Sequence, residues 1–449
     1  MKVRKGQIEI ILIGILLSLL IVGIVFLKLP FFILSVTILA LGLVLITFLN
    51  TDLALVILIF SMLLSPEFKL AEVPARAVVV RVDDILLIVV FFSWLAKMAI
   101  NKELGLFRRT PINGLIVTYI LICIISTIIG ILTGGVHPLK SFFYILKYVE
   151  YFMLYFLVTN NIRDERQIKV FLVVFLITCA ITCIYALVTI EKMGGRATAP
   201  FEGPKGEPNT LGGYLVLLFA ISTGIFLYSS LRGWRIFCGI LACLIFITLL
   251  QTLSRGSYLA FIITYLVLTI LTKKKKLLLI GILLLGMCTF PFILPEKVIE
   301  RIGYTFTPRK PRVSLYGRPI PLEDSAYARI ETWKRVFREW KRRPLLGRGV
   351  TGLGLVDAQY PRVLGETGIL GFSIFMWLLI SIFRYSLSIF RAVEDGWLKG
   401  LTLGFLSGFI GLLFHSFAAA TFIIVRIMEP FWFLTGVILM LPSVKGTSV

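Results

Sequence analysis

Long apolar runs recur along this chain of 449 residues, and they constrain its fold more than any other feature. A helix needs roughly 20 apolar residues to cross about 30 Å of hydrocarbon. The runs that approach this length lie at 8–27, 31–49, 53–65, 83–100, 112–133, 140–159, 167–190, 210–230, 235–252, 256–272, 277–294, 365–384, 398–417 and 422–441. Hydrophobic residues make up 58% of the chain. We therefore expect an all-α, polytopic integral membrane protein with about 12–14 transmembrane helices.

Basic residues in the short connections predict how the chain is oriented. They cluster at Lys2, Arg4 and Lys5; Lys97, Lys102, Arg108 and Arg109; Arg163, Arg166 and Lys169; Arg232 and Arg235; Lys273–Lys276; and Arg384, Arg391 and Lys399. With an even number of spans, all these clusters fall on one side, which the positive-inside rule identifies as the cytoplasm. We therefore expect a multi-pass membrane protein with both termini in the cytoplasm. The predicted parts are a transmembrane bundle (1–294), a large outer-face loop (295–363) that holds candidate site residues, and C-terminal transmembrane helices (364–449).

The large outer-face loop is strongly basic. Between Pro295 and Arg362 it has 15 Lys or Arg and 7 Asp or Glu, a net charge of 15 − 7 = +8. Such a loop suggests a site for an anionic group, for example a lipid-linked diphosphate. The alternative is a solvated loop attracted to anionic lipid head groups, which the charge count alone favours.

Residues 324–343 of this loop predict an amphipathic helix at the membrane interface. Most of its arginines lie opposite an apolar side, which carries Ile330, Trp333, Val336, Phe337 and Trp340. Arg329 is the exception, since it falls on the flank of the apolar face. A cation in that position favours a buried anionic partner, and snorkelling to the interface is the alternative.

Two arginines lie in other outer-face connections. Arg255 stands in the junction Gln251–Tyr258 between two apolar runs, where an arginine is costly unless it is paired or hydrated. Its guanidinium can bind two phosphate oxygens, or it can instead bond loop carbonyls. Arg196 lies in the glycine- and proline-rich connection 194–209. There it either binds a phosphate or sugar or anchors the chain at the membrane interface.

Polar residues gather where the large loop returns to the membrane. A glycine-rich segment that includes Arg348 is followed by Asp357, Tyr360, Arg362 and Glu366. A carboxylate there can act as a general base toward a sugar hydroxyl, or it can simply bond the nearby arginines.

Two further positions lie in the last spans. His415 is a second candidate, although such a histidine is more often a satisfied interhelical residue. Arg426 and Glu429 follow one helical turn apart and are expected to pair.

Several site classes are excluded. All six cysteines lie in apolar runs without zinc-site spacing, and His137 and His415 are the two histidines. The sequence contains no phosphate-binding loop, dinucleotide fingerprint or nucleophile elbow. We expect no metal, no cofactor and no nucleic-acid partner.

The order of these motifs resembles that of the O-antigen ligase and O-antigen polymerase superfamily of multispanning membrane glycosyltransferases. The resemblance rests on Leu253-Ser254-Arg255-Gly256, on Arg329 with Trp333 before Pro344, and on Leu364-x-Glu366-x-Gly368, and it extends from about Arg81 onward. It implies a metal-independent, inverting transfer of glycan from an undecaprenyl-diphosphate carrier on the outer face. Arg255 and Arg329 match the family's essential arginines.

The chain departs from this family at one position. Family ligases usually carry a histidine nine residues before the Leu-x-Glu glutamate, and Asp357 stands there in this sequence. A carboxylate can accept the same proton, but the change puts ligation to the lipid A core of lipopolysaccharide in doubt. A polymerase-like or other glycan-transfer role is favoured accordingly.

The sequence therefore predicts a glycosyltransferase of cell-surface polysaccharide assembly. Its partners are an undecaprenyl-diphosphate-linked glycan donor, a glycan, lipid or other acceptor, and membrane lipids. The expected catalytic residues are Asp357, Arg255 and Arg329, and the expected substrate-binding residues are Arg196, Arg348, Tyr360, Arg362, Glu366 and His415. A lipid-linked glycan flippase and a non-catalytic assembly scaffold are the two alternatives.

Overall fold

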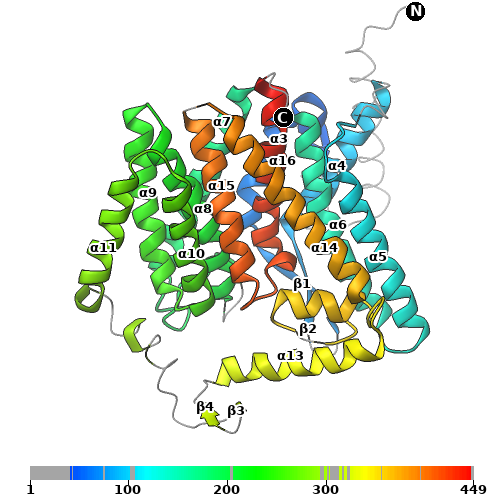
Figure 1. Cartoon of the computed structure of the whole chain (residues 1–449). Coiled ribbons are helices and arrows are strands. Elements are labelled where there is room, and N and C mark those ends of the chain that lie inside the picture. The colour runs from blue at the N-terminus through cyan, green and yellow to red at the C-terminus, as the bar shows by residue number, and fades with distance from the viewer. Residues whose placement is uncertain are drawn as a thin grey trace, which may run out of the picture.

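The described part of the chain is a helical bundle crossed at one end by a single helix (Figure 1). The computed structural model describes residues 41–42, 44–73, 76–101, 107–202, 206–293, 298–300, 303, 313–315, 318–320, 324–354, 356–394 and 396–445. The all-α expectation is confirmed, and two short antiparallel hairpins, β1–β2 and β3–β4, are the strands within these residues.

The helices follow the order of the apolar runs. They are α3 (Thr51–Leu64), α4 (Val82–Ile100), α5 (Asn113–Leu132), α6 (Pro138–Asn161), α7 (Glu165–Val188), α8 (Pro208–Tyr228), α9 (Arg232–Gln251), α10 (Arg255–Leu271), α11 (Lys276–Ile293), α13 (Asp324–Arg342), α14 (Gln359–Ala392), α15 (Trp397–His415) and α16 (Val425–Lys445). The remaining elements are β1 (Glu67–Val73), β2 (Arg76–Arg81), β3 (Val313–Leu315), β4 (Arg318–Ile320) and the 3-10 helix η1 (Thr421–Ile423).

Eight helices of the described residues are long and apolar enough to cross a membrane, namely α5–α9 and α14–α16. Three shorter apolar helices lie at Thr51–Leu64, Arg255–Leu271 and Lys276–Thr289. Each predicted run from 53–65 onward coincides with a helix. The run 8–27 and most of the run 31–49 lie outside the described residues. The total number of spans therefore stays a prediction.

Helices α8 and α15 form the centre of the bundle. Within α8, 94% of the most apolar window is buried by other parts of the chain, so this helix faces protein on all sides. Glycines permit its contact with α15, because a Cβ atom at Gly224 would lie 2.1 Å from the carbonyl oxygen of Gly400. Small residues at such crossings allow helix backbones to approach closely in a membrane.

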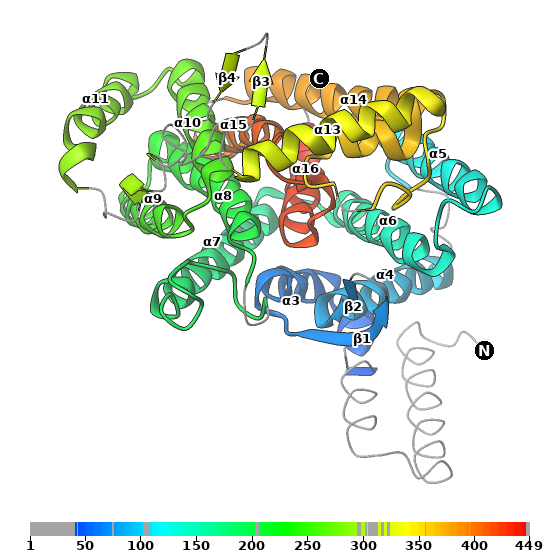
Figure 2. The same ribbon diagram turned by 90° about the horizontal axis from the view of Figure 1, so that it is seen from below.

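The predicted amphipathic helix of residues 324–343 is confirmed as α13, which runs across the ends of the other helices (Figure 2). Its Val336 is buried against Leu353 and Val356. Phe337, expected on the apolar side, is 41% exposed, so the buried stripe is narrower than the periodicity indicates.

A bend in α14 shapes the chain after α13. Gly368 has a φ angle of +66°, which favours glycine and interrupts the helix. The amides of Ile369 and Leu370 donate to the carbonyl oxygens of Pro344 and Leu345, at 2.8 and 3.2 Å. These bonds fix the glycine-rich segment over the bend. The first turns of α14 are thereby held at the same end of the bundle as α13.

Candidate functional site

A cavity of about 580 Å³ opens at the end of the bundle where α13 lies. Its described walls come from the hairpin β1–β2, α6, the connection 189–207 with the start of α8, α13, residues 356–362 at the start of α14, and the connection 416–424 with the start of α16. Its ionisable lining residues are Arg81, Lys140, Lys147, Arg196, Arg329, Arg362 and Arg426, with Glu67, Glu202, Glu207 and Asp357. Among these described residues the balance is 7 − 4 = +3. A cationic hollow of this size suits an anionic ligand.

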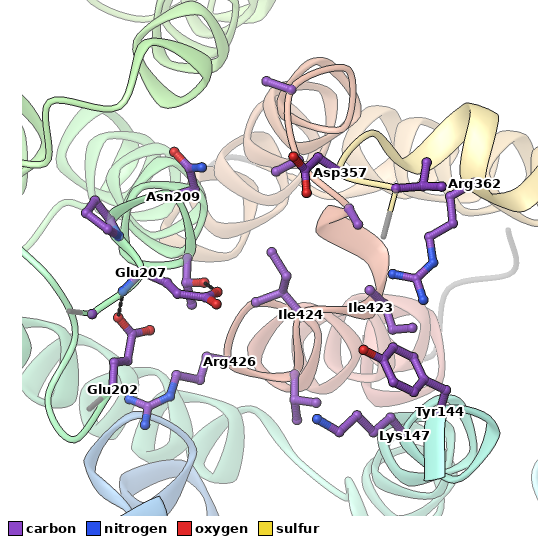
Figure 3. A pocket seen from close by; sticks show the side chains of 18 of the residues that line it. Tyr144, Lys147, Glu202, Glu207, Asn209, Asp357, Arg362, Ile423, Ile424 and Arg426 are labelled. Atoms are coloured by element: carbon purple, nitrogen blue, oxygen red, sulfur yellow. Dashed lines mark hydrogen bonds between the residues drawn. The ribbon is translucent and has the colours of Figure 1, made fainter. Parts of the chain in front are cut away.

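Figure 3 shows two opposite sides of this cavity. Glu202, Glu207 and Asn209 lie on one side, and Tyr144, Lys147 and Arg362 lie on the other. The aliphatic side chains of Ile423 and Ile424 separate them. Glu202 and Glu207 thus lie across the cavity from Lys147 and Arg362, and Arg426 lies beside Glu202.

The cationic side is built on one face of α6. Lys140, Tyr144 and Lys147 are spaced by four and three residues, so they project from the same side of the helix. The guanidinium of Arg362 lies 5.2 Å from the centre of the Tyr144 ring. Lys140 and Lys147 form no side-chain hydrogen bond or ion pair with the residues that the structure describes. Their charges are therefore available to a ligand.

Arg362 lies against Glu366, and of these two residues it is Arg362 that lines the cavity. Arg362 Nε lies 3.3 Å from the Glu366 carboxylate, and both residues are buried. The Glu366 carboxylate also accepts a hydrogen bond from the backbone amide of Thr351 at 2.9 Å. Glu366 therefore orients Arg362 and ties the glycine-rich segment to α14.

The acidic side is built on the connection 189–207. Glu202 Oε2 accepts hydrogen bonds from the backbone amides of Ala199 and Glu207, at 3.3 and 2.9 Å. Burial raises the pKa of Glu202 to about 7, although Arg426 favours the charged form and acts in the opposite direction. This carboxyl therefore changes its charge near neutral pH.

Arg426 on α16 fixes this connection in place. Its Nη1 donates to the carbonyl oxygen of Pro200 at 2.5 Å, and its Nη2 pairs with Glu67 at 3.1 Å. The expected pair of Arg426 with Glu429 is wrong. Glu429 instead lies 3.4 Å from Arg81, because the β1–β2 hairpin supplies a closer partner to each residue.

Arg81 organises a buried acidic cluster beside the cavity. Its Nη2 lies 2.5 Å from Asp83, 3.4 Å from Glu429 and 3.6 Å from Asp84. Carboxylate oxygens of these three acids lie within 4.8 Å of one another, a spacing that metal ligands also show. The guanidinium already supplies positive charge at this point, so we interpret the cluster as an ion-pair network.

Four of the sequence-derived candidates line the cavity: Arg196, Arg329, Asp357 and Arg362. Arg196 also donates to the carbonyl oxygens of Thr252 and Leu253, at 3.0 and 3.3 Å, so it joins its connection to the α9–α10 turn. Asp357 is exposed, and it forms no hydrogen bond or ion pair with the described residues.

The other candidates lie outside the lining. Arg255 begins α10 next to Ser254, whose hydroxyl bonds Asn209 at 2.6 Å. Arg348 forms an ion pair with Glu339 of α13, and the Tyr360 hydroxyl donates to the carbonyl oxygen of Leu413 at 2.7 Å.

His415 is fully buried between helices. Its Nε2 lies 3.2 Å from the hydroxyl of Ser257 and its Nδ1 lies 2.8 Å from the hydroxyl of Thr421. This geometry agrees with the satisfied interhelical histidine that the sequence favoured.

Several lining residues were not among the candidates predicted from the sequence, above all Lys140, Glu202 and Glu207. The spacing of Lys140, Tyr144 and Lys147 at the end of an apolar run is a usable signal, because it places two cations on one helix face. Glu202 has no comparable signal, since it lies in an irregular connection. Tertiary contacts alone bring it to the cavity.

Comparison with known proteins finds a family match for part of the chain. No curated protein sequence matches the chain. The family model described as O-antigen ligase matches residues 239–376, a segment that contains Arg255, α13 and the first half of α14. This match confirms the resemblance noted in the sequence, and it identifies residues 239–376 as an O-antigen ligase domain of the O-antigen ligase and polymerase superfamily.

Proposed function

We propose that this protein is a glycosyltransferase of cell-surface polysaccharide assembly. It transfers or polymerises a glycan from an undecaprenyl-diphosphate carrier onto an acceptor sugar, without a metal and with inversion. The observation that carries the proposal is the cationic cavity, whose wall includes Arg329, Asp357 and Arg362 of the O-antigen ligase domain. Cations held in place before the reaction stabilise the charge that develops on a departing diphosphate.

The lining suggests how the reaction is divided among residues. Arg329 and Arg362, with Lys140 and Lys147, hold the diphosphate at the cationic side. An acceptor hydroxyl attacks the anomeric carbon, and the bond from that carbon to the diphosphate oxygen breaks with its electron pair going to the carrier. A carboxylate takes the hydroxyl proton, and the resemblance gives that part to Asp357. Arg255 stays in the proposal through its match to an essential family arginine, acting from the rim.

The charge distribution supports a cavity on the outer face of the bacterial cytoplasmic membrane. At the end of the bundle opposite the cavity, Lys445 pairs with Glu165 at 2.5 Å, and the amide of Lys273 bonds the Tyr228 hydroxyl at 3.2 Å. The basic connections after α6, α8 and α10 lie at this opposite end. By the positive-inside rule, this end faces the cytoplasm and the cavity faces outward.

An assay with purified protein and a lipid-linked glycan tests the proposal. We expect a product of higher mass with the wild type. We expect Arg329→Ala to lower the rate by about 100-fold or more, because one preorganised charge contact is lost. Arg338→Ala, on an exposed position of the same helix, is the matched control and should keep wild-type activity.

Other outcomes identify the alternatives. Movement of the lipid-linked glycan across the bilayer without a longer product would indicate a flippase. Neither product nor movement would indicate a scaffold. Wild-type activity in Arg329→Ala would remove this arginine from the proposed site.

A further inference from the structure

The cavity contains a carboxylate that is held more firmly than Asp357. Glu202 lies across the cavity from Arg362, on the side built by the connection 189–207 (Figure 3). One of its oxygens accepts two backbone hydrogen bonds, as described above. The other oxygen, Oε1, accepts no hydrogen bond from the described residues. Glu202 thus combines a fixed orientation with a free acceptor atom.

The backbone around Glu202 is constrained in an unusual way. Phe201 has a φ angle of +60°, which residues other than glycine rarely adopt. Arg426 donates to the carbonyl oxygens of both Pro200 and Phe201, and the amide of Ala197 donates to the carbonyl oxygen of Gln251 at 2.8 Å. A strained residue persists where its surroundings hold it, and such residues cluster at functional sites. Here the strain is next to the carboxylate that lines the cavity.

We propose that Glu202 is the general base of the transfer reaction, accepting the proton of the acceptor hydroxyl on Oε1. The inference rests on the proposed function and names a residue that neither the motifs nor the family match assigns. As the hydroxyl oxygen bonds to the anomeric carbon, its proton passes to the Glu202 carboxylate. The carrier diphosphate leaves with the electron pair of the broken bond, toward Lys147 and Arg362 on the opposite side.

Asp357 fits this part less well. It is exposed, and none of the described residues orients its carboxylate. A general base needs a fixed geometry relative to the proton that it removes. In this assignment Asp357 binds substrate hydroxyls at the edge of the cavity, and the acceptor sugar lies between Asp357 and Glu202.

The acid–base properties of Glu202 support the assignment. The groups that face it are Arg426 from α16, Glu67 from β1 and Glu207 from its own connection. Burial raises its pKa to about 7, and a base is most effective when its pKa lies near the working pH. The carboxylate form is the active form. The rate should therefore fall as the pH drops below about 7.

The experiment measures pH–rate profiles with purified protein, a lipid-linked glycan donor and its acceptor. Glu202→Gln keeps an oxygen for the two backbone amides but cannot take a proton. We expect it to lose roughly 100-fold or more in kcat and to lose the decline below neutral pH. Glu202→Asp should restore part of the rate, and the acid limb of its profile, the decline of the rate at low pH, should lie at a different pH. Asp357→Asn should keep the acid limb near pH 7, with its main effect on KM.

Glu191→Gln, an exposed position in the same connection that does not line the cavity, is the matched control. Inhibition by a short polyprenyl diphosphate should be unchanged in Glu202→Gln, which shows that the donor site is intact. If Glu202→Gln does not fold, the profile of Glu202→Asp decides, since an acid limb identical to that of the wild type overturns the proposal.

The proposal is also overturned if Glu202→Gln keeps the rate and acid limb of the wild type while Asp357→Asn loses both. If wild-type protein forms no product at all, the proposed function fails, and this inference fails with it. If the wild type is active and Glu202→Gln has the same rate, the proposed function still holds, but Glu202 is not its general base.

Discussion

At the scale of single residues, the charges of this protein are paired across long stretches of sequence. Arg81 meets Asp83 next to it but also Glu429, and Arg426 meets Glu67. All of these lie at the cavity end of the bundle, and Arg81, Asp83, Arg426 and Glu429 are buried there. Removing one member of a buried pair leaves an uncompensated charge, which costs more than the pair contributes.

Arg81→Ala should therefore destabilise the protein strongly. The guanidinium is 6% exposed, and its loss leaves three neighbouring carboxylates without their cation. We expect a loss of about 3–5 kcal/mol in the free energy of unfolding, measured by thermal unfolding in detergent. Lys140→Ala, which breaks no pair among the described residues, is the control. Equal melting temperatures for the two variants would contradict the network.

At the scale of secondary-structure elements, the contact between α8 and α15 determines the packing of the centre. Gly224, Gly400 and Gly404 remove side chains from the crossing, and a Cβ atom at any of them would lie within 2.1–2.5 Å of the partner backbone. The helices approach more closely there than larger residues permit. The cavity lies at the other ends of these helices, since Pro208 at the start of α8 lines it, whereas Gly224 lies near the end of α8 and Gly400 near the start of α15.

Gly224→Ala should force α8 and α15 apart. Overpacking of this kind costs about 1–3 kcal/mol, and here backbone atoms, which cannot turn aside, would have to move. Gly233→Ala in α9 is the control, since a Cβ atom there meets nothing within 4 Å. Thermal unfolding of both variants provides the measurement. Equal stability of Gly224→Ala and Gly233→Ala would contradict a close contact between the backbones of α8 and α15.

At the scale of the whole molecule, the cavity and the basic connections lie at opposite ends. The connection 189–207 lies at the cavity end, and the connection from Ser229 to Leu231 lies at the other. This separation makes the orientation in the membrane testable without any knowledge of the substrate.

On a cysteine-free background, Glu191→Cys should react with a membrane-impermeant maleimide in intact cells. Ser230→Cys should react only after the membrane is opened, because positive connections stay in the cytoplasm. Labelling is measured by the mass shift of the protein on a gel. The reverse pattern would put the cavity on the cytoplasmic side and exclude transfer on the outer face.

The positions of the helices could be predicted from the sequence, because span length and periodicity are local properties. The run 324–343 forms α13. The glycine-rich residues after Pro344 form an irregular segment, because glycine disfavours a helix. Arg329, Asp357 and Arg362 were also selected from local motifs, and all three line the cavity.

Which charges meet could not be predicted in this way, because it depends on how the helices pack. Arg426 prefers Glu67 to its helical neighbour Glu429, Arg255 lies outside the lining, and Glu202 enters the cavity from an irregular connection. These outcomes depend on segments separated by hundreds of residues, such as the 226-residue separation between Pro200 and Arg426. A local pattern shows which groups are costly to bury, but the partner that compensates each charge is set by how the helices pack.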